Sequence, residues 1–172
     1  MTHPLQHASL ICGLSLSLFV VSCQSPSADV NAVFDTNAVT IAEIFADFSA
    51  EDDNMYRHYD ENAIWRGTGI ASPDTITLAQ AKAYYSDLWS KYDFELVSEA
   101  NFLPGVDAET KKTDGSVRGY FTWAISKPAT DSTERKTVEV KLYESFDFTI
   151  DGKIAFAQVY GNLESAYGIL ED

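Results

Sequence analysis

The sequence predicts an α+β domain in which helices pack on the concave face of a cone-like, curved antiparallel sheet. Two early segments repeat apolar residues at helical spacing, and the chain from Phe94 onward is rich in β-branched and aromatic residues. Turn residues divide that second part into four consecutive runs. Helices that precede a run of strands are typical of α+β architecture, with the helices layered on one sheet face.

The first helix is expected from Thr36 to about Ser49, and a second helix is expected to begin near Thr77. Between them, Tyr59–Gly69 predicts a short strand that ends in a glycine-rich turn. Apolar residues mark the buried stripes of the two helices: Ile41, Ile44, Phe45 and Phe48 in the first, and Leu78, Ala81, Tyr85, Leu88 and Tyr92 in the second, with Trp89 beside them.

Four strands are expected in the second half, at residues 94–103, 116–126, 136–150 and 153–161. Asp151–Gly152 between the last two predicts a two-residue type I′ turn, which pairs Ile150 with Lys153 and places Glu144 opposite Val159. For the preceding hairpin, the alignment that best matches apolar faces pairs Trp123 with Val140, Phe121 with Leu142, and Gly119 with Glu144.

Glu144 does not fit its strand, because it lies within an apolar stripe on the face that the helices should cover. Gly119 beside it has no side chain to fill the adjacent space, so a pocket around the carboxylate is expected. Two alternatives stay open: a β-bulge could turn Glu144 to solvent, or Arg118 or Arg66 could pair with it. If it faces a pocket, Glu144 is the candidate catalytic base. The expected pocket residues are Trp65, Tyr85, Trp89, Gly119, Phe121, Trp123, Phe146 and Val159.

The N-terminus predicts a lipoprotein signal peptide at residues 1–22. Leu10–Val21 is an apolar run too short to span a bilayer, and Val20–Cys23 resembles the bacterial lipobox, in which the cysteine is lipidated. An ordinary secretory signal is the alternative. Residues 23–35 are expected to form a flexible tether, and residues 36–172 the folded domain. The resemblance implies a cell-envelope protein anchored through Cys23, in the outer membrane of a Gram-negative bacterium.

Composition excludes several classes of function. The formal net charge of −14 disfavours binding to nucleic acid or to anionic lipid headgroups, so membrane contact is expected only through the lipid anchor. Beyond Cys23 the chain has no cysteine, and His58 is the only histidine. No metal site and no cofactor is therefore expected, since glycine-rich phosphate or dinucleotide motifs are also missing.

Several segments together resemble the nuclear transport factor 2-like superfamily, in its branch of ketosteroid isomerase and polyketide cyclase-like (SnoaL-like) proteins. The resemblance rests on the early helix, Tyr59–Gly69, Thr77–Tyr92 and Phe146–Asn162. It implies a cone-shaped fold around an apolar pocket. Cyclase-like members often carry an acid five residues after the isoleucine of the Gly-Lys-Ile hairpin. That position is Val159 here, so the family's acid is missing, and Glu144 is expected opposite it.

Three functions are compatible with these observations. The first is a lipid-anchored module that binds a small apolar or aromatic molecule. The second is an isomerase, cyclase or dehydratase that uses Glu144 as base and a tyrosine as hydrogen-bond donor. The third is an interaction module, because the resemblance implies a homodimer through the outer sheet face at Tyr120, Tyr143, Phe156 and Tyr160. The sequence favours binding, and it does not decide whether the protein is an enzyme.

Overall fold

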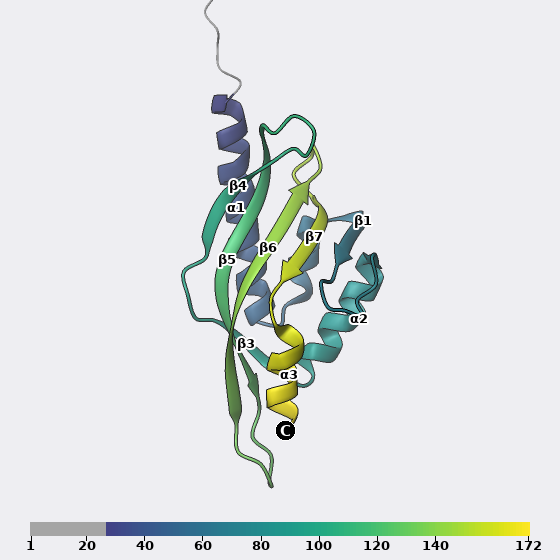
Figure 1. Cartoon of the computed structure of the whole chain (residues 1–172), viewed down its shortest axis with the longest axis vertical. Helices are drawn as coiled ribbons and strands as arrows, with labels where there is room; N and C mark the ends of the chain where they lie inside the picture. Colours follow the sequence, from purple (N-terminus) through teal and green to yellow (C-terminus); the bar gives the residue numbers. More distant parts are fainter. Residues whose placement is uncertain (1–26) are drawn as a thin grey trace, which may run out of the picture.

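The computed structural model describes residues 27–172. The predicted signal peptide and Cys23 lie outside the described residues. Figure 1 shows a curved sheet with two helices, α1 and α2, on one side of it. The sheet has seven strands in the order β2-β1-β7-β6-β5-β3, with β4 also paired to β5. The predicted α+β class with helices on a curved sheet is confirmed. One edge differs from the fully antiparallel expectation, because β1 runs parallel to β7.

The first helix, α1 (Ser27–Ser49), begins well before the expected start at Thr36. Residues 27–35, expected to be part of a flexible tether, therefore belong to the helix. Within the added turns, Val33 lies against Gly115 of the sheet. Asn37 is buried, and its Nδ2 donates a hydrogen bond of 2.9 Å to the carbonyl of Gly115 on β5. Helix stability in proteins comes mostly from such packing rather than from local propensity.

A 3₁₀ turn, η1 (Asp53–His58), leads into β1 (Tyr59–Arg66), which matches the predicted short strand. The chain then forms a loop and the two-residue strand β2 (Ile76–Thr77). The second helix, α2 (Leu78–Trp89), begins where predicted, because Thr77 and Gln80 form a reciprocal capping box.

The run predicted as one strand from Phe94 to Leu103 is two strands, β3 (Asp93–Leu96) and β4 (Asn101–Val106). Both pair with the same neighbour, β5 (Thr113–Lys127), on either side of an irregular segment at residues 97–100. There the Oγ of Ser98 accepts the backbone N–H of Thr122. The strand beside β5 is therefore interrupted at this point and does not run continuously from residue 94 to residue 103.

The two long hairpins have the predicted register over most of their length. In the pair of β5 with β6 (Lys136–Phe148), Trp123 lies opposite Val140, Phe121 opposite Leu142, and Gly119 opposite Glu144. In the pair of β6 with β7 (Ile154–Tyr160), Glu144 lies opposite Val159 and Phe146 opposite Ala157.

The turn between β6 and β7 differs from the prediction. The N–H of Gly152 donates to Thr149, and the N–H of Thr149 donates to Lys153, so the loop has three residues and Gly152 takes a positive φ of 74°. Ile150 is fully exposed and does not pair with Lys153. Phe148 then pairs with Ile154, and a bulge between Asp147 and Phe148 restores the predicted register beyond it. A three-residue loop with a left-handed glycine is a common hairpin alternative to the type I′ turn.

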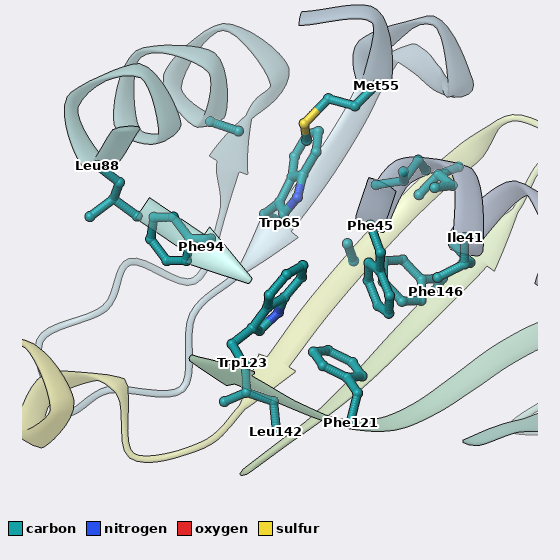
Figure 2. Close-up of a cluster of buried hydrophobic side chains, with 14 of the residues drawn as sticks. Ile41, Phe45, Met55, Trp65, Leu88, Phe94, Phe121, Trp123, Leu142 and Phe146 are labelled. Atoms are coloured by element: carbon teal, nitrogen blue, oxygen red, sulfur yellow. The ribbon is translucent and has the colours of Figure 1, made fainter. Parts of the chain in front are cut away.

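A short helix at the chain end, α3 (Leu163–Glu171), was not predicted. The core lies between the sheet and the helices, and Figure 2 shows its aromatic centre. Phe45 of α1 meets Phe121 and Trp123 of β5 with ring centroids 4.5 and 5.7 Å apart. Within residues 27–172, no helix has the length and apolar character needed to cross a membrane.

Candidate active site

A cavity of about 810 Å³ opens between the sheet and the helices. Its wall is mainly apolar and aromatic, as is usual for small-molecule sites. The interior residues come from α1, η1, α2 and five strands: Ile44, Phe45, Phe48, Met55, Tyr59, Trp65, Tyr85, Leu88, Phe94, Trp123, Ile125, Leu142, Glu144, Phe146 and Val159. The wall therefore depends on elements that are far apart in the sequence.

Glu144 faces this cavity, together with five of the residues that the sequence placed in a pocket. These five are Trp65, Tyr85, Trp123, Phe146 and Val159. Trp65 and Trp123 point into the interior from β1 and β5 (Figure 2).

Three other expected pocket residues lie outside the wall of this cavity. Phe121 is buried in the core against Phe45. Trp89 packs on Phe48 with ring centroids 5.4 Å apart. Gly119 was expected to leave a space beside Glu144, and this is wrong. Phe102 pairs with Gly119 across β4 and β5, and its ring comes within 3.3 Å of where a Cβ of Gly119 would lie.

The backbone at Glu144 is regular, so no bulge turns it to solvent. It pairs with Gly119 on one side and Val159 on the other, and the register shift in β6 occurs only after Asp147. The two arginines considered as partners are engaged elsewhere. Arg118 lies 2.9 Å from Asp147, and Arg66 donates to the carbonyl of Asp74 and lies over Phe156. Within the described chain, Glu144 has neither an ion pair nor a hydrogen bond.

Burial in this apolar setting raises the pKa of Glu144 to about 8. The side chain is half-buried, and it contributes to the cavity wall. Removing a carboxylate from water disfavours its charged form, and no cation offsets the effect here. Glu144 can therefore exchange a proton near neutral pH, which an ordinary glutamate with a pKa near 4.5 does poorly.

Two tyrosine hydroxyls accompany the carboxylate. Burial raises the pKa of Tyr59 and of Tyr85 well above 10, and the negative charge of Glu144 is the next largest cause for both. Both side chains line the cavity, and the structure shows no hydrogen bond from either hydroxyl to another described residue. They stay protonated at neutral pH and are available to donate hydrogen bonds to a ligand.

The mouth of the cavity is formed by the loop 67–73 and by α3. Leu163, Glu164 and Tyr167 of α3 line it, and the carboxylate of Glu164 lies against Gly69. The end of α3 is held by Glu171, which accepts from Tyr92 at 2.5 Å and pairs with Lys127 at 2.5 Å. Across residues 27–172, no three His, Cys, Asp or Glu side chains are grouped so that they could hold a metal ion.

Sequence reasoning missed two parts of this site. Tyr59 shares its odd position in β1 with the buried residues Ala63 and Trp65, and that alternation could have identified it. The residues of α3 gave a weaker signal, because the helix is short and contains Gly168.

No protein-family model matches the chain, and no curated protein matches its sequence. Solved structures do match its fold. A candidate polyketide cyclase from a Silicibacter species is 22% identical with a TM-score of 0.58, covering 75% of this chain and 90% of its own. A candidate isomerase from Bacillus subtilis is 18% identical with a TM-score of 0.60, covering 79% and 95%. The epoxide hydrolase/cyclase-like enzyme SalBIII, linked to pyran-ring formation in salinomycin, is 20% identical with a TM-score of 0.55, covering 76% and 93%.

These similarities show that the chain has the nuclear transport factor 2-like fold, in the form found in polyketide cyclase-like proteins. At such low identity they establish the fold, whereas the chemistry must be argued from the site itself.

Proposed function

We propose that the protein is an enzyme of the isomerase or cyclase type, with Glu144 as its general base. The observation that carries this proposal is the convergence of an unpaired carboxylate and two protonated tyrosine hydroxyls on one apolar cavity. A base beside hydrogen-bond donors suits the removal of a proton from a carbon next to a carbonyl group. Proteins of similar structure that are described as cyclases and isomerases favour an enzymatic function over ligand binding alone.

The proposed reaction uses only Glu144 and the two tyrosines. The Glu144 carboxylate takes a proton from the carbon, and the electron pair of the broken C–H bond moves onto the carbonyl oxygen to form an enolate. Tyr59 and Tyr85 donate hydrogen bonds to that oxygen, where the negative charge develops. The protonated Glu144 can return its proton to a different carbon, which gives isomerisation. Alternatively, the enolate carbon attacks a second carbonyl in the same molecule, and the alkoxide formed there takes the proton back from Glu144, which completes ring closure.

Proton abstraction can be tested without the natural substrate by using 5-nitrobenzisoxazole, a flat aromatic C–H acid. Removal of its ring C–H proton breaks the N–O bond and releases a coloured phenolate, so the probe reports a base and its oxyanion donors together. We expect Glu144→Gln to lower kcat/KM by about 100-fold or more. Glu139→Gln is the matched control, because Glu139 lies on the same strand but is exposed. Equal turnover by the wild type and Glu144→Gln would reject Glu144 as the base.

The rate should also depend on pH in a defined way. Only the ionised carboxylate can accept a proton, so kcat/KM should rise with pH and level off above about 8. A rate that is flat across this range would contradict the assignment even if Glu144→Gln were inactive.

Ligand binding without chemistry is the second candidate, favoured by the predominantly apolar and aromatic wall. It predicts that Glu144→Gln binds a neutral aromatic probe such as 2-naphthalenemethanol as tightly as the wild type, and that neither protein turns over 5-nitrobenzisoxazole.

Dimerisation through the outer sheet face is also proposed. Tyr120, Tyr143 and Tyr160 form a row of adjacent rings there, with centroids 4.8 and 5.7 Å apart, and Tyr120 and Tyr160 are about half exposed. Light scattering of the wild type and of Tyr120→Lys would test this, since a dimer formed by this face should dissociate when a charge enters it.

Attachment to the cell envelope through Cys23 remains a proposal from the sequence alone. Cells grown with labelled palmitate should label the wild-type protein, and Cys23→Ser should remain unlabelled.

A further inference from the structure

Helix α3 lies at the mouth of the cavity, and it is too short to be stable by itself. It has nine residues, it includes Gly168, and its N-cap residue Asn162 makes no side-chain capping bond. Isolated helices of this length are marginal in water, glycine weakens them further, and a missing cap leaves backbone N–H groups without partners. The position of α3 is therefore set by its contacts with the rest of the protein.

These contacts differ on the two sides of α3. On one side, Ala166 and Leu170 are buried in the core against the sheet. The other side lies beside the end of α2 (Figure 1), where the rings of Tyr167 and Tyr92 stack with centroids 5.2 Å apart. Burial and the neighbouring hydroxyl of Tyr84 raise the pKa of Tyr167, and both tyrosines line the cavity. A movement of α3 about its sheet-packed side would separate Tyr167 from Tyr84 and widen the mouth.

The end of α3 is fastened by a clasp of three polar groups, Glu171, Tyr92 and Lys127. One carboxylate oxygen of Glu171 accepts a hydrogen bond of 2.5 Å from the Tyr92 hydroxyl, and the other lies 2.5 Å from Nζ of Lys127 on β5. About half of the Glu171 side chain is exposed, and ion pairs that water can reach contribute little. The clasp can therefore break while the core stays packed. All three residues lie outside the cavity wall, so any effect that they have on access must pass through α3.

We propose that α3 is a gate: a ligand reaches Glu144 when α3 moves away from α2, and the clasp holds the gate closed. The proposal rests on the proposed function in taking this cavity as the site, but it concerns access and not the reaction. A molecule that occupies the space of about 810 Å³ between sheet and helices must pass the mouth. Closure behind it would exclude water from the carboxylate, as lids of other enzymes do for their sites.

A thiol inside the cavity measures how often the gate opens. Val159→Cys places this cavity thiol opposite Glu144, in the full chain carrying Cys12→Ser and Cys23→Ser. The probe 4,4′-dithiodipyridine is a neutral aromatic disulfide; exchange with the thiolate releases a thiopyridone whose absorbance gives the rate. Ala157→Cys supplies the matched control, a buried thiol on the same strand but outside the cavity wall, which should react only when the protein unfolds.

Two variants open the gate in different ways. Glu171→Ala removes the clasp and should raise the reaction rate of the cavity thiol about tenfold, because a charge-assisted hydrogen bond and an ion pair are lost together. Tyr167→Ala shortens the side chain at the mouth and should raise that rate at least as much. Neither variant should change the rate of the buried thiol. Asp87→Ala, which removes an exposed ion pair with Lys91 on α2, should change neither rate.

Salt tests the ionic part of the clasp. The cavity thiol of the protein with an intact clasp should react about twofold faster or more in 1 M than in 0.05 M NaCl, because salt screens the attraction between Lys127 and Glu171. In Glu171→Ala this acceleration should vanish.

Three results would overturn the proposal. The first is a cavity thiol that reacts as fast as free cysteine while the clasp is intact. The second is a cavity thiol that is no faster in Glu171→Ala. The third is an equal acceleration of the buried thiol, which would mean that the whole fold had loosened. Because the labelling needs neither substrate nor turnover, its outcome is independent of whether Glu144 acts as a base on 5-nitrobenzisoxazole.

Discussion

Glu144 on β6 lies directly opposite Val159 on β7, and both side chains face the same cavity. In cyclase-like proteins that the sequence resembles, the position of Val159 often carries the acid. The carboxylate of this protein comes instead from the neighbouring strand. Because cross-strand partners have Cβ atoms about 5 Å apart, an acid at either position reaches the same region of the cavity.

This relationship predicts that the base can be moved across the strand pair. Glu144→Val alone should lose activity on 5-nitrobenzisoxazole, and the double variant Glu144→Val/Val159→Asp should recover it to within about tenfold of the wild type. The matched control is Glu144→Val/Gln158→Asp, because Gln158 is next in the strand and points to the other sheet face. Recovery in both double variants, or in neither, would show that activity does not depend on placing a carboxylate at this point of the cavity.

The same carboxylate should make stability fall as pH rises. Its pKa is about 8 in the folded protein and near 4.5 when unfolded, so the folded state binds more protons between these values. The free energy of unfolding should decrease across this window by at most about 1.4 kcal/mol per pH unit, and this contribution should be constant above it. Urea unfolding of the wild type and Glu144→Gln at several pH values measures the difference.

Glu144→Gln should therefore be more stable than the wild type, by a margin that grows between about pH 5 and pH 8. Glu139→Gln removes one exposed acid from the same strand and should follow the wild-type profile. A constant difference between Glu144→Gln and the wild type would mean that the carboxylate is not desolvated in solution.

The register around Glu144 could be predicted because alternating side chains allow only one pairing that keeps apolar faces together. That constraint acts over the whole length of β6, so it survived a wrong turn prediction at Asp151–Gly152. The turn itself depends on local hydrogen bonds of Thr149 and Lys153. The alternation of apolar side chains along the strand does not indicate these bonds.

The cavity wall was less predictable, because it depends on where separate elements stop. The break between β3 and β4 brings Phe102 over Gly119 and fills the space that the glycine was expected to leave. The open volume lies instead where α2 and α3 approach the sheet, and α3 gave no strong signal in the sequence. Such placements are set by tertiary packing, which strand alternation does not encode.

The two tyrosines beside Glu144 should matter more for turnover than for folding. No hydrogen bond from either hydroxyl to another described residue is seen, so Tyr59→Phe and Tyr85→Phe should shift the free energy of unfolding by less than about 1 kcal/mol. Loss of a donor to a developing oxyanion should lower kcat/KM by about 10- to 1000-fold. Tyr143→Phe, on the outer face, is the control and should leave both quantities unchanged. A large loss of stability with no change in rate would assign these residues to the core alone.

The extended helix α1 should depend on one buried contact. The Nδ2 of Asn37 donates to the carbonyl of Gly115, which has a φ of 83° and packs against Val33. Asn37→Ala leaves that carbonyl buried without its partner and should reduce the free energy of unfolding by about 1–3 kcal/mol. Asn31→Ala, at an exposed position of the same helix, should change it by less than about 0.5 kcal/mol. Equal values for the two variants in urea unfolding would show that α1 is held by its apolar face alone, because the bond to Gly115 would then contribute no measurable stability.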